Sequence, residues 1–296
     1  MYSGYLLEKY KQIFQEEVIE SLAKPLKQSI RINELKATED ELVPRLKEKG
    51  ILLEKIPWTR KGYFVTDAPF SIGATPEYLL GYYFIQDAAS MYACEVLAPQ
   101  RGEVVLDMTA SPGGKTTYLA QLMDNDGAII ALELNRERMK SLRSNISRMG
   151  VENTIAIRMD ALAVEELGIL FDRILLDVPC TGVGTVSKNP EAAQKIKEDV
   201  SKCSALQIEL LQAAERVLKK GGILVYSTCS FLPEENEFVV QQALDDLSLR
   251  LEDVQFGEEA FTECYGVKLS KDMAKAKRFY PHIHGTQGFF IARLRK

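Results

Sequence analysis

The stretch "DMTASPGGKTTYLA", residues 107–120, decides the fold. It follows the apolar run "EVVL" and leads into a segment with helical spacing, so it predicts a strand, a glycine-bearing loop and a helix. Gly114, Lys115 and Thr116 match the end of a phosphate-binding P-loop, but Thr109 stands where that motif begins with glycine. A triphosphate-binding loop is therefore the weaker interpretation.

From Leu106 onward, short runs rich in Val, Ile and Leu alternate with helical patterns, which predicts parallel strands joined by crossover helices. The fold class is therefore α/β, a Rossmann-like sheet with helices on both faces. Two last apolar runs are expected to close this sheet as an antiparallel hairpin at one edge. The parallel candidates are residues 103–109, 128–134, 153–160, 171–179 and 222–229, and the hairpin candidates are 249–256 and 288–296.

The region before this sheet has a different pattern. Residues 4–24 and 38–50 predict amphipathic helices, the second opened by Thr38, and residues 29–34 and 62–67 predict strands. We expect a small α+β domain over residues 1–85 and the sheet domain over residues 86–296.

Composition excludes several classes of protein. The chain of 296 residues is 46% hydrophobic, which is enough for a globular core, and its apolar runs fall short of the roughly 20 residues that cross a membrane. The N-terminus lacks the order of a signal peptide, so we expect a cytoplasmic protein without membrane contact. Five cysteines without a CxxC pair and two histidines favour neither a disulfide framework nor a metal site. The net charge of -5 argues against coating nucleic acid through bulk charge.

Two acidic residues follow later strands of the predicted sheet. Glu133 ends the second strand, where a carboxylate can hydrogen-bond ribose hydroxyls, and Asp160 ends the third, where it could meet an adenine amine. Ligands of open parallel sheets bind beyond the carboxyl ends of the strands, beside the glycine loop. Two acids would repel a pyrophosphate, so the pattern favours S-adenosylmethionine, whose sulfonium is positive. Solvated strand ends are the alternative.

Two cysteines end the next pair of strands, Cys180 in "DVPCTG" and Cys229 in "STCS". A thiolate that adds to carbon 6 of cytosine makes carbon 5 nucleophilic enough to accept a methyl group. Asp177 is placed to stabilise that adduct by protonating or hydrogen-bonding ring nitrogen 3, and a second thiol could assist release. The sequence thus suggests methylation of carbon 5 of a cytosine.

The segments "DMTASPGGKTT", "LLDVPCTGVG", "VYSTCS" and "GFFIARL" together resemble the RNA (cytosine-5) methyltransferases of the Nop2/Sun family. Upstream, "SIRINELK" and "GYYFIQDAASM" match that family's N-terminal segments, and the chain looks most like the bacterial RsmF-type 16S rRNA enzymes. Those enzymes usually continue into a C-terminal RNA-binding extension, which this chain lacks. Short forms of the family also methylate tRNA, so the resemblance implies rRNA as the first candidate substrate and tRNA as the second.

The resemblance also implies a role for each site residue. Cys229 is the nucleophile and Cys180 promotes release, although DNA cytosine methyltransferases attack with the Pro-Cys cysteine instead. Lys115 positions Asp177 or the base. We also expect residues 1–85 to bind RNA and the protein to be a monomer. The S-adenosylmethionine site comprises Thr109, Ala110, Ser111, Pro112, Gly113, Gly114, Lys115, Glu133, Arg138, Asp160 and Asp177.

The C-terminal segment is strongly basic, because residues 268–296 hold eight Lys or Arg against one Asp. Within it, Lys275, Lys277 and Arg278 could contact RNA phosphates, and the rings of Phe279 and Tyr280 could stack on unpaired bases. A solvated basic loop is the alternative. Two other functional classes stay open for the whole chain: a P-loop-like nucleotide hydrolase and a non-catalytic RNA-binding protein.

Overall fold

The computed structural model describes residues 2–296, which pack as two compact units. The first, here called the glycine-loop unit, comprises Lys27–Ala163 and Leu170–Leu175. The second, called the cysteine unit, comprises the residues up to Leu26 together with Val164–Ile169 and Leu176–Lys296. Strand β8 (Phe171–Asp177) therefore begins in the glycine-loop unit and ends in the cysteine unit.

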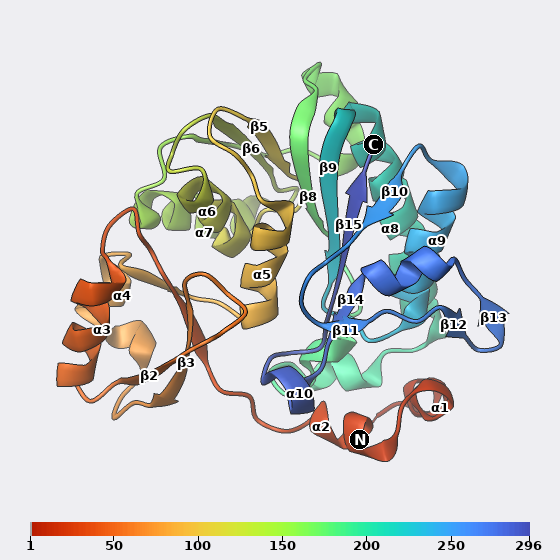
Figure 1. Cartoon of the computed structure of the whole chain (residues 1–296), viewed down its shortest axis with the longest axis horizontal. Coiled ribbons are helices and arrows are strands. Elements are labelled where there is room, and N and C mark those ends of the chain that lie inside the picture. The colour runs from red at the N-terminus through yellow and green to blue at the C-terminus, as the bar shows by residue number, and fades with distance from the viewer. Residues whose placement is uncertain (1) are drawn as a thin grey trace. The chain divides into compact units, whose positions relative to one another are not determined.

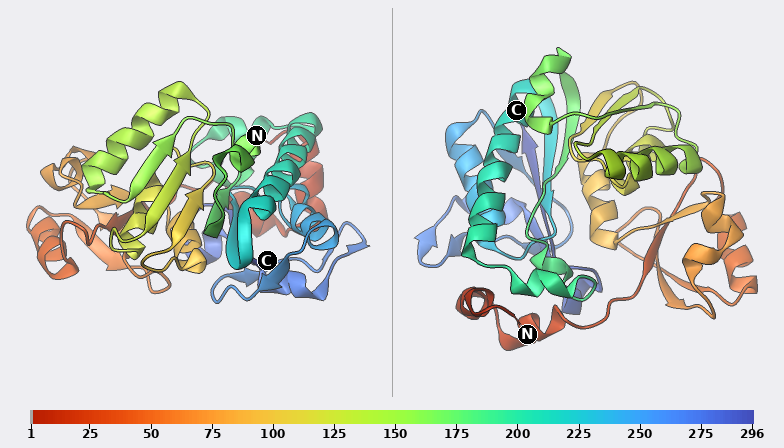
Figure 2. Two further views of the ribbon diagram at one scale, coloured as in Figure 1. Left: turned by 90° about the horizontal axis from the view of Figure 1, so that it is seen from above. Right: turned by 180° about the vertical axis from the view of Figure 1, so that it is seen from behind.

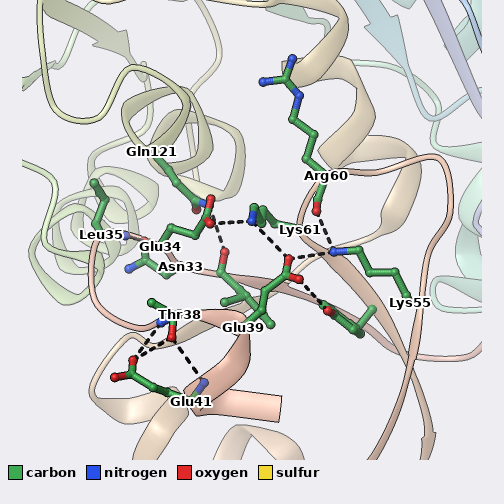
Figure 3. A network of polar contacts seen from close by, with 12 residues as sticks. Asn33, Glu34, Leu35, Thr38, Glu39, Glu41, Lys55, Arg60, Lys61 and Gln121 are labelled. Carbon is green, nitrogen blue, oxygen red and sulfur yellow. Dashed lines mark hydrogen bonds and ion pairs between the residues drawn. The ribbon is translucent and has the colours of Figure 1, made fainter.

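The glycine-loop unit begins with a four-stranded antiparallel sheet in the order β2-β3-β1-β4. Ile30 and Ile32 of β1 are buried against Leu42 and Leu46 of α3. As expected, Thr38 opens this helix, through a capping box with Glu41 that Figure 3 shows. The elements are β1 (Ser29–Ile32), α3 (Glu39–Glu48), β2 (Leu52–Lys55), β3 (Gly62–Asp67), η1 (Ile72–Ala74), α4 (Pro76–Leu79) and β4 (Tyr83–Ile85).

A parallel sheet follows in the same unit and carries the glycine loop. Strand β5 pairs in parallel with β6 and with the first part of β8, and β6 pairs with β7. Helices α6 and α7 pack against each other (Figure 1). The elements are α5 (Ala88–Leu97), β5 (Val104–Asp107), α6 (Gly114–Leu122), β6 (Ala128–Leu132), α7 (Arg136–Met149) and β7 (Thr154–Ile157), followed by η2 (Ala161–Leu167).

The cysteine unit is built on strand β9 (Leu218–Thr228), which pairs antiparallel with the C-terminal strand β15 (Phe289–Arg295). Figure 2 shows the long helix α8 (Lys197–Val217) beside β9. The other elements are α1 (Gly4–Ile13), α2 (Glu16–Ser21), η3 (Val183–Thr185), η4 (Pro190–Gln194), η5 (Pro233–Glu235), α9 (Glu237–Asp246), β10 (Arg250–Glu252), β11 (Glu258–Glu259), β12 (Glu263–Cys264), β13 (Val267–Lys268), η6 (Lys271–Lys275), β14 (Lys277–Phe279) and α10 (Pro281–His284).

The Rossmann-like α/β fold is confirmed, and each predicted parallel strand is present with shorter or shifted ends. The expected antiparallel pairing of the last two runs is also found, because β10 pairs with β15. The expected edge hairpin is nevertheless incomplete: β15 also pairs with β14 and β9, so it lies inside its sheet. In residues 2–296, no helix is long and apolar enough to cross a membrane.

Candidate active site

The glycine loop, residues 108–113, joins β5 to α6 and is held by the carboxylate that ends the strand. Asp107 is 1% exposed, and its Oδ2 accepts a hydrogen bond of 2.7 Å from Thr116 Oγ1. Gly113 caps α6 with φ +104°, in the left-handed region, and a Cβ there would lie 3.2 Å from Leu142 Cδ1. A side chain at this position would therefore be strained by the backbone and crowded by α7.

A buried arginine from the N-terminal sheet also fastens the start of α6. Arg31 is 0% exposed, and its Nη1 donates to the carbonyl oxygen of Gly114 at 2.6 Å while its Nη2 donates to Thr117 Oγ1 at 2.9 Å. Its guanidinium lies 4.6 Å from the centroid of the Tyr118 ring. Burial lowers the pKa of Arg31 to about 10. The sequence analysis missed this residue, although "SIRINELK" contains it.

Glu133 lies directly after β6, is 6% exposed and joins the glycine loop through Arg138. Its Oε1 accepts the backbone N–H of Asn135 at 2.7 Å, and its Oε2 lies 3.5 Å from Arg138 Nε. Arg138 Nη2 in turn donates to the carbonyl oxygen of Ser111 at 3.1 Å. The expected carboxylate and loop are thus brought together, because the loop and the end of β6 share one arginine.

The remaining loop-side predictions are placed as follows. Asp160 is exposed, and its Oδ1 accepts the N–H of Leu162 at 3.0 Å, while Met159 donates its N–H to the carbonyl oxygen of Glu133 at 3.3 Å. Asp160 is therefore one residue from a direct contact with Glu133. Lys115 lies in the first turn of α6 and donates to Ser90 Oγ of α5 at 3.2 Å. Asp177 and the cysteines belong to the cysteine unit.

In the cysteine unit, the ends of β8 and β9 bring the two predicted cysteines together. The Sγ atoms of Cys180 and Cys229 lie 3.0 Å apart, within hydrogen-bond distance for thiols. Just before them, Val178 donates its N–H to the carbonyl oxygen of Ser227 at 3.0 Å, and Ser227 Oγ donates to Asp177 Oδ1 at 2.7 Å. Asp177 and both cysteines therefore form one cluster at neighbouring strand ends.

Two glycines allow the backbone around this cluster to pack closely. The N–H of Gly184 donates to the carbonyl oxygen of Cys229 at 2.9 Å, and the N–H of Gly288 donates to the carbonyl oxygen of Gly184 at 2.9 Å. A Cβ on Gly184 would lie 2.4 Å from the Gly288 oxygen, and one on Gly288 would lie 1.8 Å from Phe231 Cε2. Gly184, the second glycine of "TGVG", and Gly288, the glycine of "GFF", are thus required by close packing.

The Cys180 thiol is held in its protonated form. Its hydrogen bond with Cys229 and its burial raise the pKa of Cys180 well above the usual range. A thiol that keeps its proton is a poor nucleophile but can donate to the neighbouring sulfur.

A buried carboxylate next to the cysteines was missed by the sequence analysis. Glu235, in η5, is 0% exposed and accepts hydrogen bonds from Thr181 and Ser230, the residues that follow the two cysteines. Burial raises the pKa of Glu235, although these hydrogen bonds oppose that rise. The sequence shows only an acidic residue shortly after "STCS". Its burial, which the structure reveals, is what distinguishes it from a surface residue.

The structure contradicts the RNA contacts expected of Arg278, Phe279 and Tyr280. Arg278 is 1% exposed and forms a buried ion pair with Glu237, and Phe279 is 0% exposed. Tyr280 is 8% exposed, with its ring stacked on Phe231 at 5.5 Å between centroids. The alternative of a solvated loop is equally wrong here, because Arg278 and Phe279 lie in β14 inside the core.

Comparison with known proteins agrees with these features. The family model described as 16S rRNA methyltransferase RsmB/F matches residues 94–295, and the model of the N-terminal domain of 16S rRNA methyltransferase RsmF matches residues 5–88. The chain belongs to the RsmB/F family. The resemblance to Nop2/Sun and RsmF-type enzymes is thereby confirmed.

Relatives of this RsmB/F-family chain include enzymes named for two kinds of RNA. The chain is 42% identical to a 28S rRNA (cytosine-C(5))-methyltransferase of Mus musculus, covering 100% of itself but 39% of that protein. It is 40% identical to the tRNA (cytosine(49)-C(5))-methyltransferase of Pyrococcus abyssi, covering 98% of itself and 95% of that protein. A solved methyltransferase homolog from Pyrococcus horikoshii is 46% identical with a TM-score of 0.92, covering 99% of this chain and 96% of that one.

Proposed function

We propose that the protein methylates carbon 5 of a cytidine in RNA, with S-adenosylmethionine as methyl donor and a covalent adduct to Cys229 as intermediate. The observation that carries the proposal is the pair of Sγ atoms 3.0 Å apart, beside Asp177, at the ends of β8 and β9. Membership of the RsmB/F family supports the methyltransferase over the P-loop hydrolase and over a non-catalytic RNA-binding protein.

The residues of the glycine-loop unit fit S-adenosylmethionine. Glu133 is a buried carboxylate at a strand end, suited to ribose hydroxyls, and it lies beside the glycine loop at the carboxyl ends of the parallel strands. Asp160 is exposed and free to meet the adenine amine. When bound, S-adenosylmethionine supplies a methyl group on a positive sulfonium. The described residues include no group of three or more metal-ligating side chains that could hold a metal ion.

The chemistry then follows from the cysteine cluster. Cys229 attacks carbon 6 as its thiolate, and Asp177 places a proton at ring nitrogen 3, so electron density moves to carbon 5 and that atom takes the methyl group. Loss of the carbon 5 proton to solvent water restores the double bond and breaks the bond to Cys229 Sγ, and the proton at nitrogen 3 returns to Asp177. Cys180, which keeps its proton, donates it to the departing thiolate across 3.0 Å.

Two variants test this mechanism. Cys229→Ala should be inactive and should form no covalent complex with RNA. Cys180→Ala should still attack and methylate but stall before release, so a protein–RNA band should survive denaturing electrophoresis. The opposite pattern would make Cys180 the nucleophile, and activity of both variants without an adduct would exclude covalent catalysis.

We propose rRNA as the substrate, because both matching family models describe 16S rRNA enzymes. A tRNA is the second candidate, since the Pyrococcus abyssi tRNA enzyme is matched over 95% of its length whereas the mouse rRNA enzyme is matched over 39%. Bisulfite sequencing of total RNA from a deletion strain decides between them: the cytidine that loses its methyl group identifies the RNA.

The domain proposal is that residues 1–85 bind RNA and residues 86–296 carry out catalysis. It is supported by the separate matches of an N-terminal domain model to residues 5–88 and a methyltransferase model to residues 94–295. A gel-shift titration with RNA would test this proposal. Two variants of the full chain are compared, one with charge-reversing substitutions of exposed lysines in residues 1–85 and one with such substitutions in residues 86–296.

A further inference from the structure

Glu235 connects the two cysteine loops through one carboxylate. Its Oε2 accepts the hydroxyl hydrogens of Thr181 and of Ser230, each at 2.5 Å. Its Oε1 accepts the backbone N–H of Thr181 at 2.8 Å and the side-chain N–H of Gln207 at 3.3 Å. Thr181 follows Cys180 and Ser230 follows Cys229, so the same side chain fixes the residue next to each thiol.

An ionised carboxylate satisfies all four contacts. Its Oε1 must accept, because the backbone N–H of Thr181 and the side-chain N–H of Gln207 donate to it, and its Oε2 accepts from the hydroxyls of Thr181 and Ser230. An amide in its place would force both hydroxyls to turn and accept from an NH₂ group. Burial disfavours the charged form of Glu235. The four donors must therefore replace the hydrogen bonds to water that the carboxylate loses inside the unit.

We infer that Glu235 is a positioning residue that fixes the separation of the Cys180 and Cys229 thiols; the inference rests on the proposed function, in which a proton passes between them. Glu235 reaches the thiols through Thr181 and Ser230. Close placement of two groups raises their effective concentration, and a small displacement lowers the rate of transfer steeply. Glu235 therefore acts on release of the product more than on binding of either substrate.

The effective concentration of the two thiols can be measured without any RNA. The purified protein is equilibrated with reduced and oxidised glutathione, in which two protein thiols and one glutathione disulfide give one protein disulfide and two glutathione thiols. Glu235→Gln should lower the equilibrium constant for the Cys180–Cys229 disulfide about tenfold or more, because the two loops lose their common anchor.

Glu234→Gln is the matched control. Glu234 lies in the same turn but pairs with Lys9 at 2.8 Å and accepts from Tyr265 at 3.3 Å, so it touches neither cysteine loop. Its substitution should leave the equilibrium constant within about twofold of the parent's. Thermal unfolding of each variant shows whether it is folded. A folded Glu235→Gln protein with the parent's equilibrium constant overturns the inference.

Thr181→Val and Ser230→Ala decide the question if Glu235→Gln does not fold. Each removes one donor to Glu235 Oε2 and should lower the equilibrium constant several-fold; if both leave it unchanged, the inference is wrong. The result is independent of activity. A changed thiol equilibrium in a protein that methylates no RNA would support the positioning role and reject the proposed function. An unchanged equilibrium in a protein that does methylate RNA would reject the positioning role and support the proposed function. With an active enzyme, Glu235→Gln should lower kcat with little change in KM.

Discussion

The helix that follows the glycine loop and the two cysteine loops are each anchored by a buried charge, of opposite sign in the two places. Arg31 donates to a carbonyl and a hydroxyl at the start of α6, whereas Glu235 accepts from an amide and hydroxyls beside Cys180 and Cys229. In the described part of the chain, neither forms a salt bridge with an opposite charge. Each is compensated by neutral dipoles instead, so each fixes several atoms of the neighbouring backbone and side chains at once. The difference in sign follows from the groups that each side chain meets: a carbonyl oxygen and a hydroxyl oxygen accept from Arg31, whereas an N–H and two hydroxyls beside the cysteines donate to Glu235.

The largest expected effect comes from removing the cation. Arg31→Met should lower the free energy of unfolding by about 3 kcal/mol, because Gly114, Thr117 and Gln86 lose a buried donor. Binding of S-adenosylmethionine should weaken as well, since the start of α6 is released. Chemical denaturation and calorimetry measure the two effects.

Arg101→Met is the control for that experiment. Arg101 lies in the same unit, with a side chain that is 65% exposed and paired with Asp124 on the surface. Its substitution should change stability by no more than about 0.5 kcal/mol. If Arg31→Met proves as harmless as Arg101→Met, the comparison between the two anchors fails on the glycine-loop side.

Glu133→Ala should have the next largest effect, on cofactor affinity alone. Loss of a buried partner for the ribose hydroxyls should weaken binding of S-adenosylmethionine by about 1–3 kcal/mol. The Cys180–Cys229 disulfide equilibrium should not move, because Glu133 belongs to the other unit. Glu137→Ala, an exposed substitution on α7, is the matched control. An unchanged dissociation constant for Glu133→Ala would remove this residue from the cofactor site.

The protonated state of Cys180 gives a prediction for pH. A raised pKa means that its thiolate forms only at higher pH in the folded protein than in the unfolded chain. Between pH 7 and 9, alkylation of Cys180 by iodoacetamide should therefore stay at least about tenfold slower than in denatured protein, where a thiol titrates near 8.5. Mass spectrometry of labelled peptides gives the alkylation rate as a function of pH. Restricted access to the thiol would lower this rate equally at every pH, whereas a raised pKa moves the midpoint of the curve to higher pH. A native midpoint near 8.5 would contradict the assignment.

The smallest effect is expected from Lys275 and Lys277 of the basic segment. Of the three cations expected to contact RNA phosphates, Arg278 is buried, and Lys275 already pairs with Asp272 at 2.9 Å. Replacing both with Ala should lower the slope of RNA affinity against salt by about 1 to 2. Fluorescence anisotropy across a salt series measures it. Identical slopes in parent and variant would show that this segment makes no phosphate contact.

Much of the fold could be predicted from the sequence, because its signals are local. The glycine loop, the parallel strands and the helix opened by Thr38 depend on residues within one or two turns of each other. The pairing of Cys180 with Cys229 also followed from spacing, since each ends a strand of the same sheet. The catalytic roles assigned to these residues, to Asp177 and to Lys115 stay predictions.

Only the tertiary structure could decide which charges are buried and what they hold. Arg31 meets Gly114 across 83 residues and Glu235 meets Thr181 across 54, so no local pattern marks either as an anchor. Arg278 is the opposite case. Its basic neighbours in the sequence suggest an exposed residue, yet it is buried in an ion pair with Glu237. The sequence by itself determined the periodicities, the turns and the chemistry at the strand ends. The folded chain decided the compensation of buried charge, because that depends on which distant donors and acceptors meet each side chain once water is excluded.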